Sequence, residues 1–202
     1  LYFSTDEVFG PAPNNIKYKE NDRYRSGNPY AATEAGAEEL CVAYTNTYKM
    51  PIIITHTMNV FGERQHPEKF IPKIISSLIK KKEITIHSDK NKKTPGSRFY
   101  IHAEDVADAV LFLLSRGKID QKYNIVGSKE INNLNLAKIV AKHLNINLKF
   151  KMVDFHSARP GHDLRYALSG QKLKKMGWQP KKNIERRIKQ TVDWTIKNKR
   201  WL

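Results

Sequence analysis

The chain has 202 residues, 40% apolar and 10% aromatic, enough to bury the core of one domain or of one domain and part of another. Its longest apolar run, residues 51–55, is too short to span a bilayer, and its amino terminus does not resemble a secretion signal, so we expect a cytoplasmic protein with no membrane partner. The single cysteine, Cys41, excludes an internal disulfide framework and a multi-cysteine zinc site, while the formal net charge of +16 favours anionic ligands.

The first predicted elements are the end of a buried strand and a long helix, separated by a polar loop. Apolar residues 1–3 lead into the turn residues 4–7, and a stretch rich in Pro, Gly and Asn follows. Pro29 is well placed at a helix start, and the helix is predicted to continue to about Thr47. Its apolar stripe consists of Ala35, Leu40, Ala43 and Tyr44.

Strands and helices then alternate to the end of the chain. Strands are predicted within residues 51–62, 83–87, 98–102, 122–127 and 148–154. Helices are predicted within residues 68–82, 103–117, 133–145, 170–178 and 183–199. This order favours an α/β fold, a partial doubly wound parallel sheet with a smaller α/β substrate-binding lobe. No internal repeat and no GxxGxxG turn of the dinucleotide-binding kind occurs in the sequence.

Two adjacent carboxylates, Asp6 and Glu7, precede the helix that begins near Tyr30. One interpretation is an ordinary helix-start cap, because Ser-Thr-Asp-Glu is good capping chemistry. The other is a catalytic acid–base pair, since adjacent carboxylates near a tyrosine suit proton transfer. Five histidines do not have the spacing typical of metal ligands: His56, His66, His87, His143 and His156. No metal site is therefore predicted.

Four segments together resemble one family. They are "STDEVFG", "YAATEAGAE", "NVFGERQHPEKFIP" with "SRFYIHAEDVADA", and "ARPGHDLRYALSGQKLKKMGW". In this order and spacing they are similar to the carboxy-terminal two thirds of dTDP-glucose 4,6-dehydratases, which are NAD-dependent extended short-chain dehydrogenases/reductases. The resemblance implies that residues 1–62 are the carboxy-terminal part of an NAD-binding Rossmann-type domain. Residues 63–202 would then form a nucleotide-sugar lobe interleaved with the remaining Rossmann-type elements.

The resemblance also implies catalytic roles. The family oxidises C4 of a hexose with NAD, eliminates water across C5 and C6, and returns the hydride to C6. By motif position Tyr30 is the oxidation base, Asp6 the acid, Glu7 the base at C5, and Thr5 a hydrogen-bond partner of the substrate.

One position departs from the family. Four residues after the tyrosine the family has a lysine, whose charge favours the tyrosinate and whose amine binds the nicotinamide ribose; here the residue is Glu34. A carboxylate there opposes ionisation of the tyrosine. We therefore expect that this chain alone neither retains NAD nor completes the reaction, and an alternative is a module that binds nucleotide sugars without turnover.

The nucleotide-sugar half of the family site is better matched. The implied partner is a nucleotide-diphosphate sugar, and the sequence does not distinguish a dTDP-sugar from a UDP-sugar. The matching residues are Asn59, Glu68, Lys69, Arg98, Asn133, Arg159 and His162. Arginine suits a diphosphate because its planar fork donates two parallel hydrogen bonds.

The helix from Tyr30 to Thr47 is predicted to pair with its copy in a homodimer, because it is apolar on two faces and rich in small residues. A basic nucleic-acid-binding protein is a third hypothesis, which the net charge of +16 raises. The lysines are spread over many helix ends and loops, however, and are not concentrated in a basic strand with aromatic residues.

Overall fold

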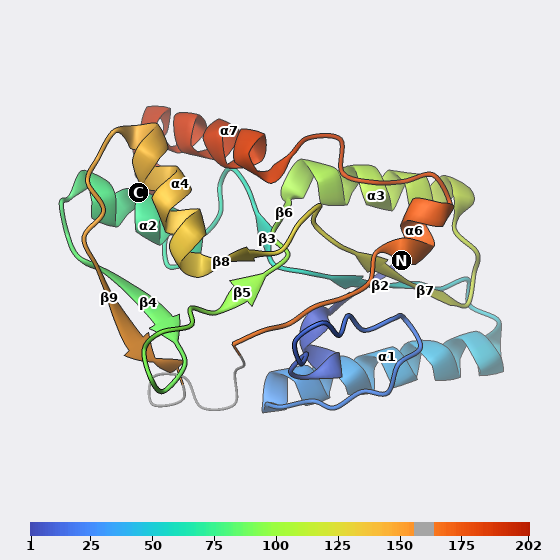
Figure 1. Ribbon diagram of the computed structural model, residues 1–202. Coiled ribbons are helices and arrows are strands. Elements are labelled where there is room, and N and C mark those ends of the chain that lie inside the picture. The colour runs from blue at the N-terminus through green and yellow to red at the C-terminus, as the bar shows by residue number, and fades with distance from the viewer. Residues whose placement is uncertain (156–163) are drawn as a thin grey trace.

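A three-stranded parallel sheet forms the centre of one half of the molecule. The computed structural model describes residues 1–155 and 164–202. In it β1 (Tyr2–Thr5), β2 (Ile53–Thr57) and β7 (Gln121–Ile125) lie in the order β1-β2-β7. Helix α1 (Pro29–Tyr48) covers one face of this sheet and α3 (Ala103–Arg116) the other (Figure 1). The predicted α/β fold with parallel pairing is confirmed.

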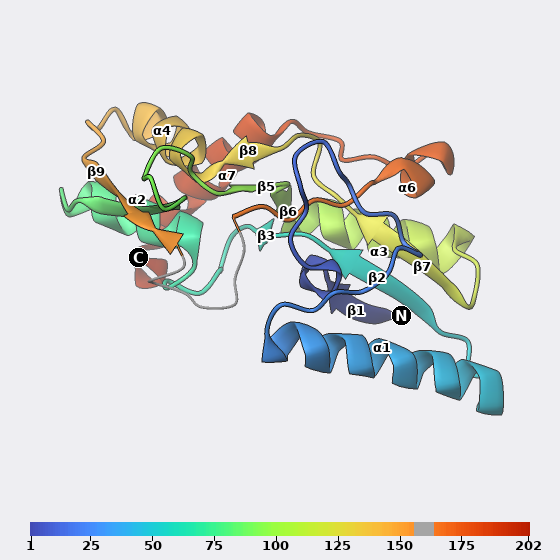
Figure 2. The same cartoon turned by 60° about the horizontal axis from the view of Figure 1, so that its bottom comes forward.

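The second half is a smaller lobe built from short strand pairs and three helices (Figures 1 and 2). Its strand pairs are β3 (Val60–Phe61) with β6 (Ile101–His102), β4 (Ile84–Ser88) with β9 (Phe150–Asp154), and β5 (Ser97–Arg98) with β8 (Ile131–Asn132). The lobe helices are α2 (Phe70–Ile79), α4 (Asn133–Leu144) and α7 (Ile184–Lys197). Short α6 (Gln171–Lys175) lies beside β7, and the 3-10 helices are η1 (Asp6–Phe9) and η2 (Lys199–Trp201).

Side-chain caps set where the long helices begin. Asn28, Asn132 and Asn183 each accept a hydrogen bond from a backbone N–H in the first turn of α1, α4 and α7. His102 does the same for α3 through Nδ1. These caps satisfy donors that a helix leaves unpaired at its amino end, so the boundaries follow from local sequence.

The largest hydrophobic core lies in the lobe, where α2 and α4 pack on β4 and α7 packs on α4. Its fully buried members include Ile75, Ile86, Leu136, Val140 and Val192. A second core joins α3 to the sheet through Ala109, Leu113, Tyr123 and Ile125. A third cluster, which contains Phe9, Met58, Phe99 and Tyr166, joins the carboxyl end of the sheet to the lobe.

One prediction about local structure is wrong, and another holds only in part. Residues 98–102 form no single strand: β5 is antiparallel to β8, and β6 is parallel to β3. The predicted strand at the start of the chain is present as β1, but its first residues are not buried, because Phe3 is 53% exposed. In α1 the stripe residues Leu40, Ala43 and Tyr44 are exposed, with Leu40 at 61%, so this part of the stripe does not pack on the sheet. None of the helices described here combines the length and apolarity needed to cross a membrane.

Candidate active site

The segment Ser4–Glu7 forms a capped turn at the carboxyl end of β1. Thr5 ends the strand, and its Oγ1 accepts a hydrogen bond from the backbone N–H of Glu7 at 3.3 Å. The chain then enters η1, with Asp6 and Glu7 in its first turn. Capping and acid–base chemistry are therefore compatible here, because the cap acceptor is the threonine hydroxyl and not one of the two carboxylates.

Asp6 is the most perturbed carboxyl of this turn. It is only 5% exposed, and burial raises its pKa to about 6, while Arg98 opposes the rise and Glu7 adds to it. Its Oδ2 is buried and has no hydrogen-bond partner among residues 1–155 and 164–202. A carboxyl that holds its proton near neutral pH is suited to act as an acid.

Glu7 is half-buried and tied to the start of α1. Asn28 Nδ2 donates to Glu7 Oε2 at 2.9 Å, while Asn28 Oδ1 accepts from the backbone N–H of Ala31 at 2.8 Å. Asn28 therefore links the carboxylate to the helix that carries Tyr30. The sequence interpretation missed this residue, although an asparagine directly before Pro29 is a recognisable cap.

Tyr30 lies in the first turn of α1, close to Thr5, and Glu34 follows one turn later. Burial raises the pKa of the Tyr30 phenol, Glu34, Glu7 and Asp6 raise it further, and a hydrogen bond with Thr5 opposes them. None of these neighbours is a cation. Tyr30 is therefore held as a neutral phenol and not as the tyrosinate that an oxidation base requires.

The Glu34 carboxylate is engaged by the neighbouring strand. Tyr2 Oη donates to Glu34 Oε2 at 3.1 Å, and burial together with this hydrogen bond raises the pKa of Tyr2 to about 12. At this position the residue present does not fit the nicotinamide ribose that the resemblance implies, because a carboxylate stands where the family has the ribose-binding amine.

Arg98 and Asn133 hold neighbouring segments of the lobe together. Arg98 donates to the carbonyls of Ser97 at 2.7 Å and Leu164 at 2.6 Å, and its guanidinium lies 4.6 Å from the centre of the Tyr166 ring. Asn133 begins α4 and accepts a hydrogen bond from Tyr100 Oη at 2.7 Å. Both predicted residues lie beside the strand pair β5–β8, and Arg98 is near enough to Asp6 to affect its pKa.

The other predicted substrate residues are less concentrated. Asn59, Glu68 and Lys69 are exposed on the segment that joins β2 to α2. Arg159 and His162 lie outside the described residues. The structure therefore brings Thr5, Asp6, Glu7, Tyr30 and Glu34 together, and the nucleotide contacts remain predictions.

Arg165 is a structural anchor that the sequence interpretation missed. Its Nε and Nη2 bind Glu130 in a fork, at 2.7 and 3.0 Å. Its Nη1 donates to the carbonyls of Ala12, Pro13 and Ile16. One guanidinium thus fixes the loop after η1 to the segment that follows residue 163, and the only sequence signal was its place in the last family motif.

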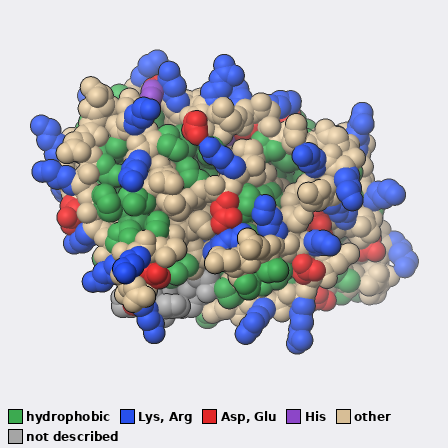
Figure 3. Space-filling view, in the orientation of Figure 1, with side chains coloured by type: hydrophobic (Ala, Val, Ile, Leu, Met, Phe, Trp, Pro, Cys, Tyr) green, Lys and Arg blue, Asp and Glu red, His purple; other side chains and the backbone are tan. Residues whose placement is uncertain are grey.

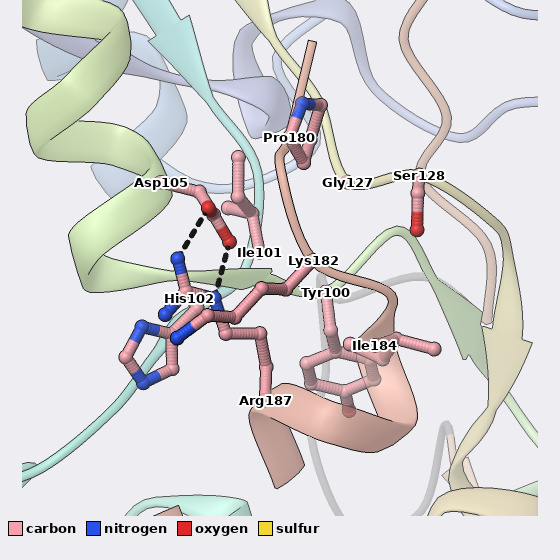
Figure 4. Close-up of a pocket in the computed structure, with 10 residues that line it drawn as sticks. All are labelled: Tyr100, Ile101, His102, Asp105, Gly127, Ser128, Pro180, Lys182, Ile184 and Arg187. Atoms are coloured by element: carbon pink, nitrogen blue, oxygen red, sulfur yellow. Dashed lines mark hydrogen bonds and ion pairs between the residues drawn. The ribbon is translucent and has the colours of Figure 1, made fainter. Parts of the chain in front are cut away.

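A small cavity of about 10 Å³, the size of one water, lies between α3 and the start of α7 (Figure 4). Beside it Arg187, which is 5% exposed, binds Asp105 through Nε at 2.8 Å and Nη2 at 2.5 Å. Its Nη1 also donates to Glu104. This buried fork joins α3 to α7.

Glu63, His102 and Glu104 offer ligand atoms within 4.8 Å of one another, the only such group of three among the described residues. Their bonding does not suit a metal ion. Glu104 is already bound by Arg187, and His102 Nδ1 accepts from the backbone N–H of Glu104 at 3.2 Å, which leaves the ring proton on Nε2. That Nε2 lies 3.2 Å from Glu63 Oε2, without the alignment of a hydrogen bond.

His102 gives a testable pH dependence. Burial lowers its pKa from the ordinary 6.5, and the nearby carboxylates oppose this. The folded state thus favours the neutral ring, so its contribution to stability is complete above pH 6.5 and is lost as the pH falls through the lowered pKa. We expect the melting temperature to fall more steeply below pH 6.5 in the native protein than in His102→Asn, which keeps a cap acceptor but does not titrate. Parallel melting curves for the two proteins from pH 8 to 5 test this; equal slopes would contradict it.

Comparisons with known proteins identify the family. Residues 1–191 match the family model described as GDP-mannose 4,6 dehydratase. The chain is 37% identical over 203 residues to a trifunctional UDP-glucose 4,6-dehydratase/UDP-4-keto-6-deoxy-D-glucose 3,5-epimerase/UDP-4-keto-L-rhamnose-reductase of Arabidopsis thaliana, covering 100% of this chain and 30% of the plant protein. It is 37% identical to the dTDP-D-glucose 4,6-dehydratase of Mus musculus, covering 98% of this chain and 56% of the mouse protein.

Among solved structures, the dTDP-glucose 4,6-dehydratase of Bacillus anthracis in complex with NAD superposes with a TM-score of 0.89 at 30% identity. The match covers 98% of this chain and 62% of the bacterial chain. The chain thus spans less than two thirds of each of these relatives. The expectation that the chain corresponds to the carboxy-terminal two thirds of its relatives is therefore wrong. The matched share of the relative's length is smaller than two thirds in all three. In the plant protein, whose name joins three activities, this share is less than one third. The resemblance itself is confirmed, and this chain belongs to the GDP-mannose 4,6-dehydratase family of nucleotide-sugar 4,6-dehydratases.

Proposed function

We propose that this chain forms the elimination half of a nucleotide-sugar 4,6-dehydratase site and does not by itself oxidise the sugar. The observation that carries the proposal is the contrast between Asp6, in the turn after β1, and Tyr30, in the first turn of α1. Burial gives Asp6 a pKa of about 6, as an acid requires, whereas the pKa of Tyr30 is raised with no cation among its described neighbours. Relatives named as UDP-glucose and dTDP-glucose 4,6-dehydratases support the substrate class.

The proton transfers of the proposed elimination need only Asp6 and Glu7, the two carboxylates of the turn after β1. The Glu7 carboxylate removes the proton at C5 of a 4-keto hexose, which is acidic because the carbanion is delocalised into the adjacent carbonyl. Asp6 gives its proton to the hydroxyl on C6, the C6–O bond breaks, and water leaves with a double bond formed between C5 and C6. Thr5 and the neutral Tyr30 phenol orient the sugar by hydrogen bonds.

The proton transfer at C5 can be measured without any redox step. We would incubate dTDP-4-keto-6-deoxyglucose with the protein in D₂O and follow the loss of the H5 signal by NMR. Exchange should exceed the protein-free rate by about a hundredfold, the scale of a positioned base, and Glu7→Gln should abolish the excess. Glu39→Gln, an exposed glutamate of α1, is the matched control and should exchange like the native protein.

Exchange at the protein-free rate, together with calorimetric binding of the same sugar nucleotide, would instead support the second candidate, a binding module without turnover. Its support is that the side chains implied for nucleotide contact, such as Arg98 and Asn133, lie beside one strand pair while the oxidation base lacks its cation. Titrating dTDP, UDP and GDP in parallel would identify the nucleotide.

A nucleic-acid-binding role is less well supported. Lys and Arg side chains are spread over the whole face in Figure 3, with Asp and Glu between them, and do not form a stripe. Polyanion binding by counterion release is strongest where cations are clustered.

We also propose that α1 pairs with its copy in a homodimer. The support is a row of large exposed apolar side chains on this helix, Leu40, Tyr44 and Tyr48, the last 69% exposed. The native protein should therefore scatter light as a dimer at micromolar concentration, and Leu40→Glu with Tyr48→Glu should give a monomer because the apposed charges repel. A native monomer across that range would refute the pairing.

A further inference from the structure

The most heavily bonded charged group outside the proposed active turn is a buried glutamate of α1. Glu38 has a fully buried side chain and lies on the sheet-facing side of the helix, two turns after Tyr30 and one after Glu34. Residues spaced by four share one face of a helix, so these three side chains form a row along the sheet.

Each strand of the three-stranded sheet supplies a partner to this carboxylate. Ser4 of β1 donates to Glu38 Oε1, and His56 Nε2 of β2 lies 3.2 Å from both carboxylate oxygens. Lys122 Nζ of β7 donates to Oε2 at 3.0 Å. One helical side chain therefore contacts all three strands at once.

The loop before α1 completes the cluster. Tyr24 Oη donates to Glu38 Oε2 and accepts a hydrogen bond from Lys122 Nζ at 2.7 Å. Behind it, Asn124 Oδ1 lies 2.9 Å from His56 Nδ1, while Asn124 Nδ2 donates to the carbonyls of Tyr18 and Ser169. The network thus extends from α1 through the sheet to two surrounding loops.

The surroundings of this carboxylate favour its ionised form. Burial alone would raise the pKa of Glu38, but hydrogen bonds and charge from His56, with Ser4 and Tyr24, outweigh it and lower the pKa to about 2. A buried ion is stable only when its partners are complete, and the Lys122 ammonium, 3.0 Å from Glu38 Oε2, adds a positive charge to the His56 contact. Removing any one partner leaves an unbalanced charge or a lost donor inside the protein.

The structure describes all 20 residues of α1, and only two of them, Ala31 and Glu38, are buried. On the same side Ala35, Cys41 and Val42 are half-buried, and Ala35 packs against the core cluster that contains Phe9. An ordinary surface helix is held by a buried apolar stripe, whereas in this fully described helix the only buried side chain larger than alanine is a carboxylate. The polar contacts of Glu38 are therefore a main determinant of how α1 lies on the sheet, and with it of the place of the Tyr30 hydroxyl beside Thr5.

We propose that Glu38, with Lys122 as its counter-ion, is a positioning residue that locks α1 to the sheet and so sets the contact between Tyr30 and Thr5. The inference deepens the proposed function, on which the meaning of that contact rests. The bonding of Glu38 itself does not depend on any activity.

The test reads the position of Tyr30 directly. We would record the ¹³Cζ resonance of Tyr30 at neutral pH, assigned with Tyr30→Phe, in native protein, Glu38→Gln, Lys122→Met and the control Glu39→Gln. Glu38→Gln and Lys122→Met should shift this resonance and make the amides of α1 exchange about tenfold faster or more, while α4 and α7 exchange as before. Glu39→Gln should match the native protein in both measurements.

A purely structural role gives a different result. In that case both variants would lower the melting temperature and speed exchange in all elements alike, with the Tyr30 resonance unmoved, and the proposal would be overturned. The double variant Glu38→Gln with Lys122→Met removes both charges. It controls for the case in which a single variant fails to fold because one charge is left without its partner. It should regain melting temperature relative to Glu38→Gln while the Tyr30 resonance stays displaced. Because no readout uses turnover, failure of the C5 exchange experiment would leave this result intact.

Discussion

Replacing Glu34 by lysine should lower the pKa of the Tyr30 phenol and free Tyr2 from its hydrogen bond. In the native protein burial raises the pKa of both phenols and Glu34 raises it further, that of Tyr2 to about 12 in all. An ammonium one helical turn from Tyr30 reverses the sign of this charge, and a close opposite charge lowers a pKa by about 1–3 units. The fraction of tyrosinate at neutral pH would then rise about tenfold to a thousandfold.

Ultraviolet difference titration at the phenolate band measures the effect, with Tyr30→Phe in each background as the subtracted reference. Glu34→Gln is the matched control, because it removes the carboxylate charge without adding a cation, and it should give an intermediate pKa. A Tyr30 titration identical in Glu34→Lys and native protein would show that position 34 does not control the phenol.

Replacing Asp105 by asparagine should strongly destabilise the fold. Arg187 is almost fully buried and donates a hydrogen bond to each oxygen of Asp105, so the variant leaves a guanidinium without its main counter-charge. Breaking a buried pair from one side costs about 3–5 kcal/mol of the free energy of unfolding. Urea denaturation would measure this loss as a lower midpoint, with an unchanged dependence of the free energy of unfolding on urea concentration.

The neighbouring Glu104 provides the control. It also binds Arg187, but its side chain is 55% exposed, so Glu104→Gln should cost about 1 kcal/mol or less. Equal losses for Asp105→Asn and Glu104→Gln would contradict the view that burial makes the first pair decisive. A double variant, Asp105→Leu with Arg187→Met, should recover much of the loss, because it removes both buried charges.

Local sequence was sufficient for the parts of the fold that local chemistry determines. The start of α1 follows from Asn28 and Pro29, and the end of α3 from Gly117, so both helices lie where they were predicted. The capped turn at Thr5 was also recognisable, since threonine before two acidic residues is a local signal. The family followed from the order of its motifs, which no single element carries.

Contacts between distant residues could not be predicted in this way. Lys122 meets Glu38 only because β7 lies beside β2 in the sheet, and nothing near either residue indicates that order. The burial that raises the pKa of Asp6 likewise depends on packing from several elements. The continuous pattern of residues 98–102 predicts one strand, whereas the pairing partners of these residues lie in two different segments.

The bonds of Arg165 have a consequence for how the protein is digested. Residues 13–16 are exposed and rich in Pro and Asn, the kind of loop at which proteases usually cut first. A protease binds several residues of its target in an extended conformation. Here the Arg165 guanidinium binds the carbonyls of Ala12, Pro13 and Ile16, which keeps this loop bent. Asn15 also has a left-handed backbone, with a φ of 68°. The loop is therefore accessible to a protease but held in a conformation that the protease does not bind. A first cut in this loop would indicate that Arg165 had lost its hydrogen bonds to the loop carbonyls.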